Sequence, residues 1–193
     1  MEYKEDLRII RTRKLLSSTL LDMMEEVSIE KISVIDLCNR AMVNRATFYA
    51  HFEDKYHLLS FALDELKDDV YAKFTNDFEV NSPSEMLKAL MNMAIDFIYD
   101  ERNHITNVIS NNRNEKVIST INDSLCQSIK YQFSKYKDTY EMKIPIQLIS
   151  CFIAGGMVNL ALWCIDNHDK CTCEELNEYA DAIAHELTFT KKV

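Results

Sequence analysis

A short segment near the N-terminus collects side chains that could contact a nucleic acid. Around two phenylalanines, Phe48 and Phe52, the chain carries a long cation, small residues, and hydroxyl, imidazole and ammonium groups: Arg45, Ala46, Thr47, Tyr49, His51 and Lys55. A guanidinium can donate two hydrogen bonds to a base edge, and the other polar groups can contact phosphate oxygens. These residue types at this spacing predict a surface that fits a DNA groove.

Two short helices are needed to hold this segment. Ser33 can cap a helix that runs to about Arg40, with Asp36 completing a capping pattern, and Asn44 can cap the next helix. Residues 41–43 then form the turn. A longer helix follows at Lys55, so the whole has helix-turn-helix spacing. The free N–H groups at the start of that longer helix can also take a phosphate.

The segment from Lys31 to Leu59 resembles the DNA-binding domain of the TetR family of regulators. The run from Asn44 to Phe52, followed by Lys55 and by Leu58–Leu59, is similar to the recognition helix of that family and the start of its fourth helix. The resemblance is specific over about residues 8–60. Beyond them it rests on an all-helical region of suitable length.

The resemblance implies a role for each matching residue. Arg45 and Ala46 would read base edges, and Asn44 would cap the recognition helix. Phosphate contacts are expected from Ser33, Thr47, Tyr49, His51 and Lys55. The chain departs from the family pattern at Ser28 and Met42, where the family usually has glycine. Met42 would be strained if the turn needs a positive φ.

Composition favours an all-α fold. The 193 residues include only two glycines and two prolines, whereas turn-rich β folds use both heavily. Apolar periodicity predicts helices over residues 5–27, 55–78, 83–99, 102–111, 113–137, 145–166 and 173–188. We expect a three-helix DNA-binding domain in residues 1–57. Residues 58–193 are expected to form a larger helical domain for effector binding and dimerisation.

The charge is unevenly distributed along the chain. The net charge is −9, yet residues 1–57 carry nine basic and ten acidic side chains, so the acidity lies mainly in the C-terminal part. A near-neutral N-terminal part permits a basic face but does not predict one. It also supports an alternative, an all-α interaction protein that keeps only a helical hairpin.

The C-terminal part contains a stretch without charge, residues 144–165. About 20 apolar residues can span a bilayer, but Pro145, Asn159 and the absence of flanking basic clusters favour a buried helix instead. The resemblance implies that the last two helices pack against their copies as a four-helix bundle. The predicted dimer contacts are Gly155, Gly156, Leu160 and Ala182.

The helices between these regions offer candidate residues for an effector pocket. These apolar residues are Phe61, Met86, Leu90, Met93, Phe97, Tyr131, Phe152 and Trp163. Each is also consistent with ordinary core packing at helical spacing. Nine methionines would suit adaptable packing around varied ligands.

The six cysteines raise one further alternative. Cys171, Cys173 and His168 could form a metal or redox sensor, although their spacing matches no recognised zinc pattern. Cys38, Cys126, Cys151 and Cys164 lie on apolar faces and are expected to be buried thiols. No metal or cofactor is predicted. The charged N-terminus lacks signal-peptide character, which predicts a cytoplasmic protein.

Together these patterns predict a sequence-specific DNA-binding regulator, a repressor released by a small-molecule effector. It would bind a roughly palindromic double-stranded site as a homodimer, away from any membrane. Activation, or co-regulation without an effector, stays open. An enzyme is not predicted, because the chain has no Gly-rich phosphate loop, nucleophile elbow or paired histidine ligands.

Overall fold

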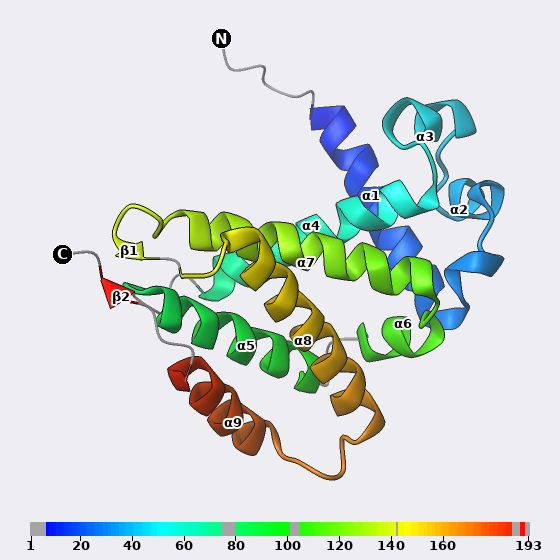
Figure 1. Cartoon of the computed structure of the whole chain (residues 1–193). Coiled ribbons are helices and arrows are strands. Elements are labelled where there is room, and N and C mark those ends of the chain that lie inside the picture. The colour runs from blue at the N-terminus through cyan, green and yellow to red at the C-terminus, as the bar shows by residue number, and fades with distance from the viewer. Residues whose placement is uncertain (1–6, 75–79, 101–104, 142, 187–189, 192–193) are drawn as a thin grey trace. The chain divides into compact units, whose positions relative to one another are not determined.

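The computed structural model describes residues 7–74, 80–100, 105–141, 143–186 and 190–191, and these residues are mostly helical (Figure 1). The helices are α1 (Leu7–Glu26), α2 (Val34–Arg40), α3 (Arg45–His51), α4 (Lys55–Phe74), α5 (Pro83–Tyr99), α6 (Ile105–Asn111), α7 (Glu115–Ser134), α8 (Ile146–Asp166) and α9 (Cys173–Glu186). The all-α prediction is confirmed. The predicted helix limits at residues 5, 78, 102 and 188 lie outside the described residues.

Side-chain caps begin several of the helices. Asp54 Oδ1 accepts hydrogen bonds from the N–H groups of Tyr56 and His57, each at 2.8 Å, at the start of α4. Thr172 and Glu175 form a reciprocal pair at the start of α9, with distances of 2.8 and 3.1 Å. Such caps satisfy backbone donors that have no partner inside the helix.

Three short elements were not predicted. A 3-10 turn, η1 (Ile29–Lys31), follows α1, where the sequence indicates only a break between helices. Strands β1 (Tyr140–Glu141) and β2 (Thr190–Lys191) pair antiparallel. Pairing between positions so far apart in sequence, in strands of two residues, leaves no periodic signal to detect.

The chain divides into two compact units. Unit 1 comprises residues 1–67 and 107–120, and unit 2 comprises residues 68–106 and 121–193. Unit 1 therefore contains α1–α3, the start of α4, most of α6 and the start of α7. This division differs from a single boundary after residue 57, because a segment distant in sequence joins the N-terminal helices.

A buried asparagine joins that distant segment to α1 and η1. Asn112 is 1% exposed. Its Nδ2 donates to the carbonyl oxygen of Met24 at 3.0 Å, and its Oδ1 accepts from the N–H of Ile29 at 2.6 Å. These bonds satisfy backbone groups between α1 and η1 that would otherwise be buried without partners.

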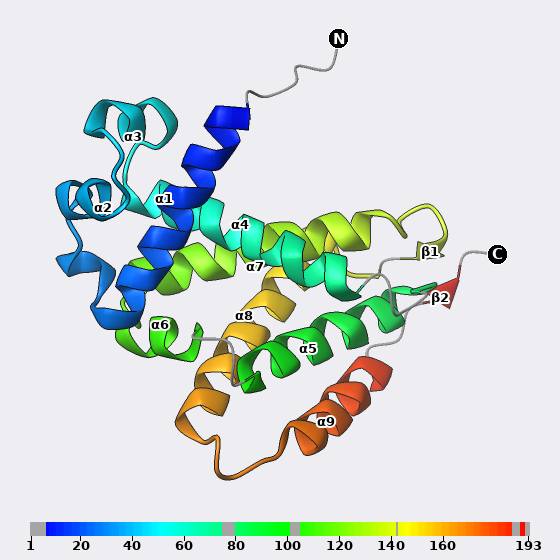
Figure 2. The same ribbon diagram turned by 180° about the vertical axis from the view of Figure 1, so that it is seen from behind.

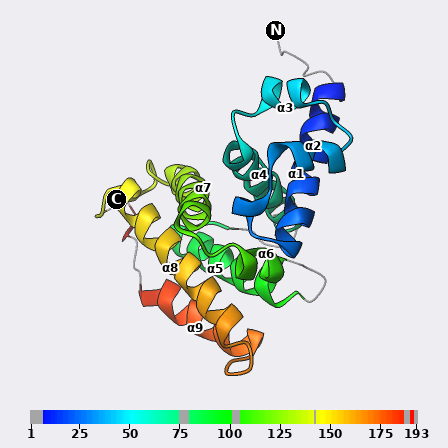
Figure 3. The ribbon, with the colours of Figure 1, turned by 90° about the vertical axis from the view of Figure 1, so that its right-hand side faces the viewer.

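The core of unit 1 is small and includes aromatic rings from the N-terminal helices. Leu16 and Leu20 of α1, Leu37 of α2 and Phe48 of α3 are fully buried. Figure 3 shows α1, α2 and α3 grouped together. Because α3 contributes a single large ring to this core, most of its surface stays free.

Unit 2 is a helical layer in which α5 packs against both α8 and α9 (Figure 2). Its core includes Leu87 and Ile95 of α5, Phe133 of α7 and Ala154 of α8, with Leu176 and Ala180 from α9. This core holds α8 by one side only, so that its other side carries large exposed apolar residues.

Candidate nucleic-acid interface

Helix α3 is anchored to unit 1 by one face. Asn44 caps it, because its side-chain oxygen accepts a hydrogen bond from the N–H of Ala46 at 2.9 Å. Phe48 is fully buried, and its ring centroid lies 5.9 Å from that of Phe52. The cap sets where the helix begins, and the aromatic pair sets its rotation.

The remaining face of α3 carries most of the residues predicted to contact DNA. Arg45, Ala46 and Tyr49 are exposed, whereas Thr47 and His51 are half-buried. Tyr49 is 52% exposed, which is consistent with the predicted phosphate contact. One short helix thus presents a guanidinium, small residues and hydroxyl donors.

The turn before α3 places a non-glycine residue in the left-handed region. Met42 has φ 53°, and its side chain is 93% exposed. The turn is closed by hydrogen bonds from Met42 N–H to Asn39 O at 3.2 Å and from Val43 N–H to Cys38 O at 2.9 Å. The backbone therefore needs the conformation that glycine adopts without a steric penalty.

Replacing Met42 with glycine should stabilise the protein by about 1 kcal/mol, because it removes this steric penalty and gives up almost no buried surface. Urea unfolding of the full chain measures the change. The matched control is Met42→Ala, which keeps the Cβ and should stay within about 0.5 kcal/mol of the parent. Equal effects of the two substitutions would show that the turn stores no strain.

Ser33 is the cap of α2, as predicted. Its Oγ accepts a hydrogen bond from the N–H of Asp36 at 3.1 Å and donates to the Asp36 carboxylate at 2.5 Å. The hydroxyl is therefore engaged within the chain. A phosphate contact at the start of α2 stays a prediction and would fall to backbone N–H groups.

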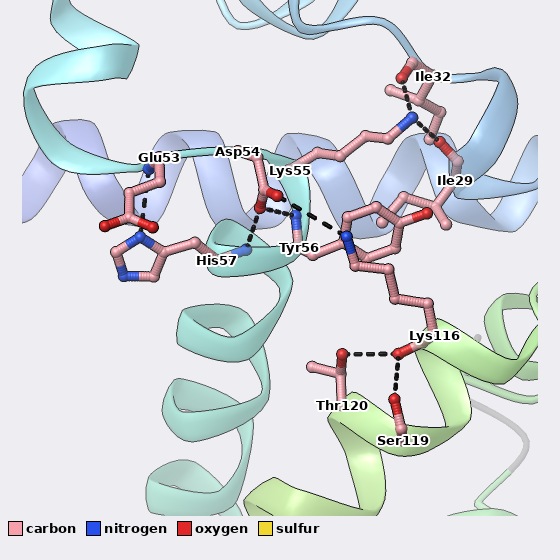
Figure 4. Close-up of polar contacts among 10 residues, drawn as sticks. All are labelled: Ile29, Ile32, Glu53, Asp54, Lys55, Tyr56, His57, Lys116, Ser119 and Thr120. Carbon is pink, nitrogen blue, oxygen red and sulfur yellow. Dashed lines mark hydrogen bonds and ion pairs between the residues drawn. The ribbon is translucent and has the colours of Figure 1, made fainter.

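The ammonium of Lys55 is engaged with backbone groups of unit 1 (Figure 4). Its Nζ donates to the carbonyl oxygens of Ile29 at 2.7 Å, Ile32 at 2.8 Å and Glu30 at 3.2 Å. An ammonium has three donors, so all of them are used within unit 1. Burial lowers the pKa of Lys55, although Glu30 and Asp54 oppose this effect. The ammonium thus has a structural role in unit 1, and the direct phosphate contact from Lys55 stays a prediction.

A second lysine, absent from the predicted site, lies beside the start of α4. Lys116 at the start of α7 has its Nζ 3.6 Å from the ring centroid of Tyr56 and 3.9 Å from Asp54 Oδ2. Figure 4 shows its side chain extending from α7 towards α4. Sequence reasoning missed Lys116 because it is 60 residues beyond Tyr56 and carries no local signal.

Arg40, like Lys55, is engaged within unit 1. It forms a two-pronged ion pair with Glu26, at 2.6 and 3.0 Å, which lowers the pKa of Glu26. Arg45 is the cation that α3 itself offers to DNA.

The predicted dimer residues fall on different sides of α8 and α9. Gly155 is half-buried, Gly156 and Ala182 are exposed, and Leu160 packs against the core of unit 2. A Cβ added to Gly156 would meet no atom within 4 Å. Beside them, α8 exposes a row of large apolar side chains: Leu148 (62%), Phe152 (73%) and Trp163 (41%).

The predicted pocket residues differ in burial and belong to both units. Leu90 and Met93 are buried, and Met86 lies at the edge of the unit 2 core. Phe61 belongs to unit 1, where the Arg13 guanidinium lies 4.2 Å from its ring centroid. Phe97 is half-buried, and three others are exposed: Tyr131, Phe152 and Trp163. The pocket lining stays a prediction.

The cysteine-based alternative finds no metal geometry. Among the described residues, no group of three or more His, Cys, Asp or Glu side chains could hold a metal ion. Cys173 Sγ instead donates to Asp96 Oδ1 at 3.3 Å. Burial, helped by Asp96, raises the pKa of Cys173 to about 11, which disfavours the metal-binding thiolate. Cys151, expected to be buried, is exposed.

Helix α8 is long and apolar enough to span a membrane, by length and composition alone. Within its most apolar stretch, 39% of the residues are buried. Its buried side chains belong to the core of unit 2. Since core helices of soluble proteins meet the same criterion, this single helix is weak evidence for a membrane span.

Comparison with known proteins gives one sequence relative above background. A Bacillus subtilis protein described as an uncharacterized HTH-type transcriptional regulator, YxbF, is 29% identical over 104 residues. The match covers 49% of this chain and 27% of the relative, so the chain spans well under two thirds of that protein. No family model matches the chain.

Solved structures match nearly the whole chain. A Listeria innocua protein aligns with TM-score 0.67 and 20% identity, covering 97% of each chain. A TetR transcriptional regulator from Streptococcus agalactiae aligns with TM-score 0.57 and 20% identity, covering 93% of this chain and 97% of that one. FadR from Bacillus subtilis, solved with stearoyl-CoA, aligns with TM-score 0.59 and 13% identity over 89% and 95%.

These alignments run through both units. The proteins from Streptococcus agalactiae and Bacillus subtilis are described as transcriptional regulators. At such low identity the alignments establish the fold. The resemblance found in the sequence is confirmed at that level: the chain has the fold of the TetR-family transcriptional regulators, with an N-terminal helix-turn-helix and a C-terminal helical domain.

Proposed function

We propose that this protein is a dimeric, sequence-specific DNA-binding transcriptional regulator. The observation that carries the proposal is the state of α3: it is capped by Asn44, anchored by Phe48, and exposed at Arg45, Ala46 and Tyr49. A helix held in this way can enter a major groove with its N-terminal residues on base edges. A helical hairpin of purely structural use would not need this exposed polar face.

Dimerisation is the second part of the proposal. The exposed row Leu148, Phe152 and Trp163 lies on one side of α8, and Tyr179 and Ile183 are exposed on α9. Exposed apolar side chains on α8 and α9 favour a protein partner. In a regulator with a recognition helix, we expect that partner to be a second copy of the chain. Two copies would present two recognition helices to a roughly palindromic site.

Release by a small-molecule effector is the third part. The chain aligns over 89% of its length with FadR from Bacillus subtilis, a transcriptional regulator solved in complex with stearoyl-CoA. We infer an effector site within unit 2 of this chain without assigning its ligand. An effector can release DNA only through its different affinity for the two dimer states. Such a regulator would act in the cytoplasm, where its DNA is.

Selection of bound sequences from random duplex DNA tests the proposal. We expect an enriched inverted repeat, with affinity that falls as salt rises. The matched control is an Arg45→Ala chain, which should enrich a less defined sequence. Two outcomes would reject the proposal in favour of an interaction protein. One is equal binding to all sequences, and the other is no binding to any library after cell metabolites have been removed.

Two substitutions in α3 should separate base reading from phosphate contact. Arg45→Ala should relax the preference at one base pair by about 1–3 kcal/mol, because one side chain reads that pair. Tyr49→Phe keeps the ring but removes the hydroxyl, so it should weaken binding to all sequences alike. Fluorescence anisotropy on the selected site and single-base variants measures both. Identical profiles for the two variants would contradict the assignment of α3.

A further inference from the structure

Two cysteines on different helices of unit 2 lie with their sulfurs in contact. Cys126 of α7 and Cys151 of α8 are both free thiols, and their Sγ atoms are 2.9 Å apart. Gln147 Nε2 lies 3.3 Å from Cys151 Sγ and 3.7 Å from Cys126 Sγ. A disulfide has an S–S distance of about 2.05 Å, so a movement of less than about 1 Å would join the two sulfurs.

The two thiols differ in their access to solvent. Cys151 is exposed and Cys126 is buried. The other four cysteines, which all lie within the described residues, are buried or half-buried: Cys38, Cys164, Cys171 and Cys173. Burial and the neighbouring Cys151 sulfur raise the pKa of Cys126 to about 11. In the single chain, Cys151 is therefore the more accessible thiol of the pair.

We propose that Cys126 and Cys151 form a redox-reactive dithiol, which a hydroperoxide oxidises to an intramolecular disulfide between α7 and α8. In the first step the Cys151 thiolate attacks the peroxide oxygen, the O–O bond breaks, and the products are a Cys151 sulfenic acid and water or an alcohol. In the second step Cys126 sulfur attacks the sulfenic sulfur, and the hydroxyl leaves as water. The peroxide gains two electrons, and two thiols become one disulfide.

The position of the pair makes the second step fast relative to further oxidation. The sulfur that must attack is already beside the sulfenic sulfur, so no segment has to unfold to bring it there. Gln147 keeps an amide donor beside both sulfurs and can stabilise the negative charge on the attacking thiolate. Cys151 directly precedes Phe152, so the pair lies at the border of the exposed apolar row of α8.

Peroxide treatment of the full-length, fully reduced protein tests the proposal. Intact mass should fall by the mass of two hydrogen atoms, and peptide mapping should find one new link, between the peptides that contain Cys126 and Cys151. The disulfide closes the loop between Cys126 and Cys151, which should raise Tm by about 5–10 °C. Dithiothreitol should reverse both changes.

Three variants make the test specific. Cys126→Ser leaves Cys151 without a partner, so Cys151 should accumulate sulfenic acid that dimedone traps. Cys151→Ser should show neither the link nor the trapped acid, whereas the control Cys171→Ser should behave as the parent. A link between any other pair, a disulfide between two chains through Cys151, or trapping of Cys151 in the parent as strong as in Cys126→Ser would overturn the proposal. None of these measurements involves DNA, so the result is independent of the proposed function.

Discussion

Replacing Lys55 with methionine is expected to lower the free energy of unfolding by about 2–4 kcal/mol. Methionine keeps most of the aliphatic stem but removes the ammonium. The carbonyl groups of Ile29, Glu30 and Ile32 then lose their donor, at distances now between 2.7 and 3.2 Å. Because Lys55 is half-buried, water would replace these bonds only in part.

Lys14→Met is the matched control. Lys14 is 65% exposed, and its single ion pair, with Glu65, is 3.6 Å long. Exposed pairs of this kind contribute little, so the change should stay below about 1 kcal/mol. Urea unfolding of both variants measures the difference.

A phosphate contact from Lys55 predicts a different pair of results for stability and salt dependence. If its ammonium served a DNA phosphate instead, Lys55→Met would leave stability unchanged. It would also reduce the slope of log affinity against log salt by about one. Unfolding and salt dependence should therefore be measured on the same variant. Together they distinguish hydrogen bonding of Lys55 to the carbonyl groups of unit 1 from a phosphate contact.

Phe152→Asp is expected to weaken self-association at least about 100-fold, because it places a charge within the apolar row of α8. Phe152 is 73% exposed in the single chain, between Leu148 and Trp163 on the same side of the helix. If two copies meet there, the aspartate must lose water without gaining a partner. Affinity for the selected operator should fall as well, since a monomer offers one recognition helix.

The control for this prediction is Tyr131→Asp on α7. Tyr131 is 64% exposed, so the two substitutions change a similar surface. Sedimentation at several protein concentrations should show the parent and Tyr131→Asp as dimers and Phe152→Asp as a monomer. A dimer in all three would place the interface elsewhere, and loss of the dimer in Tyr131→Asp would move it to α7.

Local chemistry made most of the helices predictable. Ser33, Asn44, Asp54 and Thr172 cap helices where the sequence indicates, because a cap involves groups only two or three residues apart. The scarcity of glycine and proline indicated the all-α class, because turn-rich β folds use both residues heavily. The turn at Met42 could be identified as strained once its place between α2 and α3 was known.

The direction of α3 was likewise accessible from the sequence. Its spacing separates the buried ring of Phe48 from the exposed Arg45, Ala46 and Tyr49. A seven-residue helix needs only one apolar anchor to fix which side faces outward. The predicted recognition residues followed from that anchor and from the family resemblance.

The helices, their caps and the outward face of α3 could thus be predicted from residues close together in the chain. The use of groups distant in sequence depended on how the segments pack. This packing directed the Lys55 ammonium to the carbonyls of η1, joined Asn112 to the end of α1, and brought Cys126 and Cys151 into contact. A side chain's partners depend on which segments pack beside it, and that choice is made by the whole core rather than by neighbours along the chain.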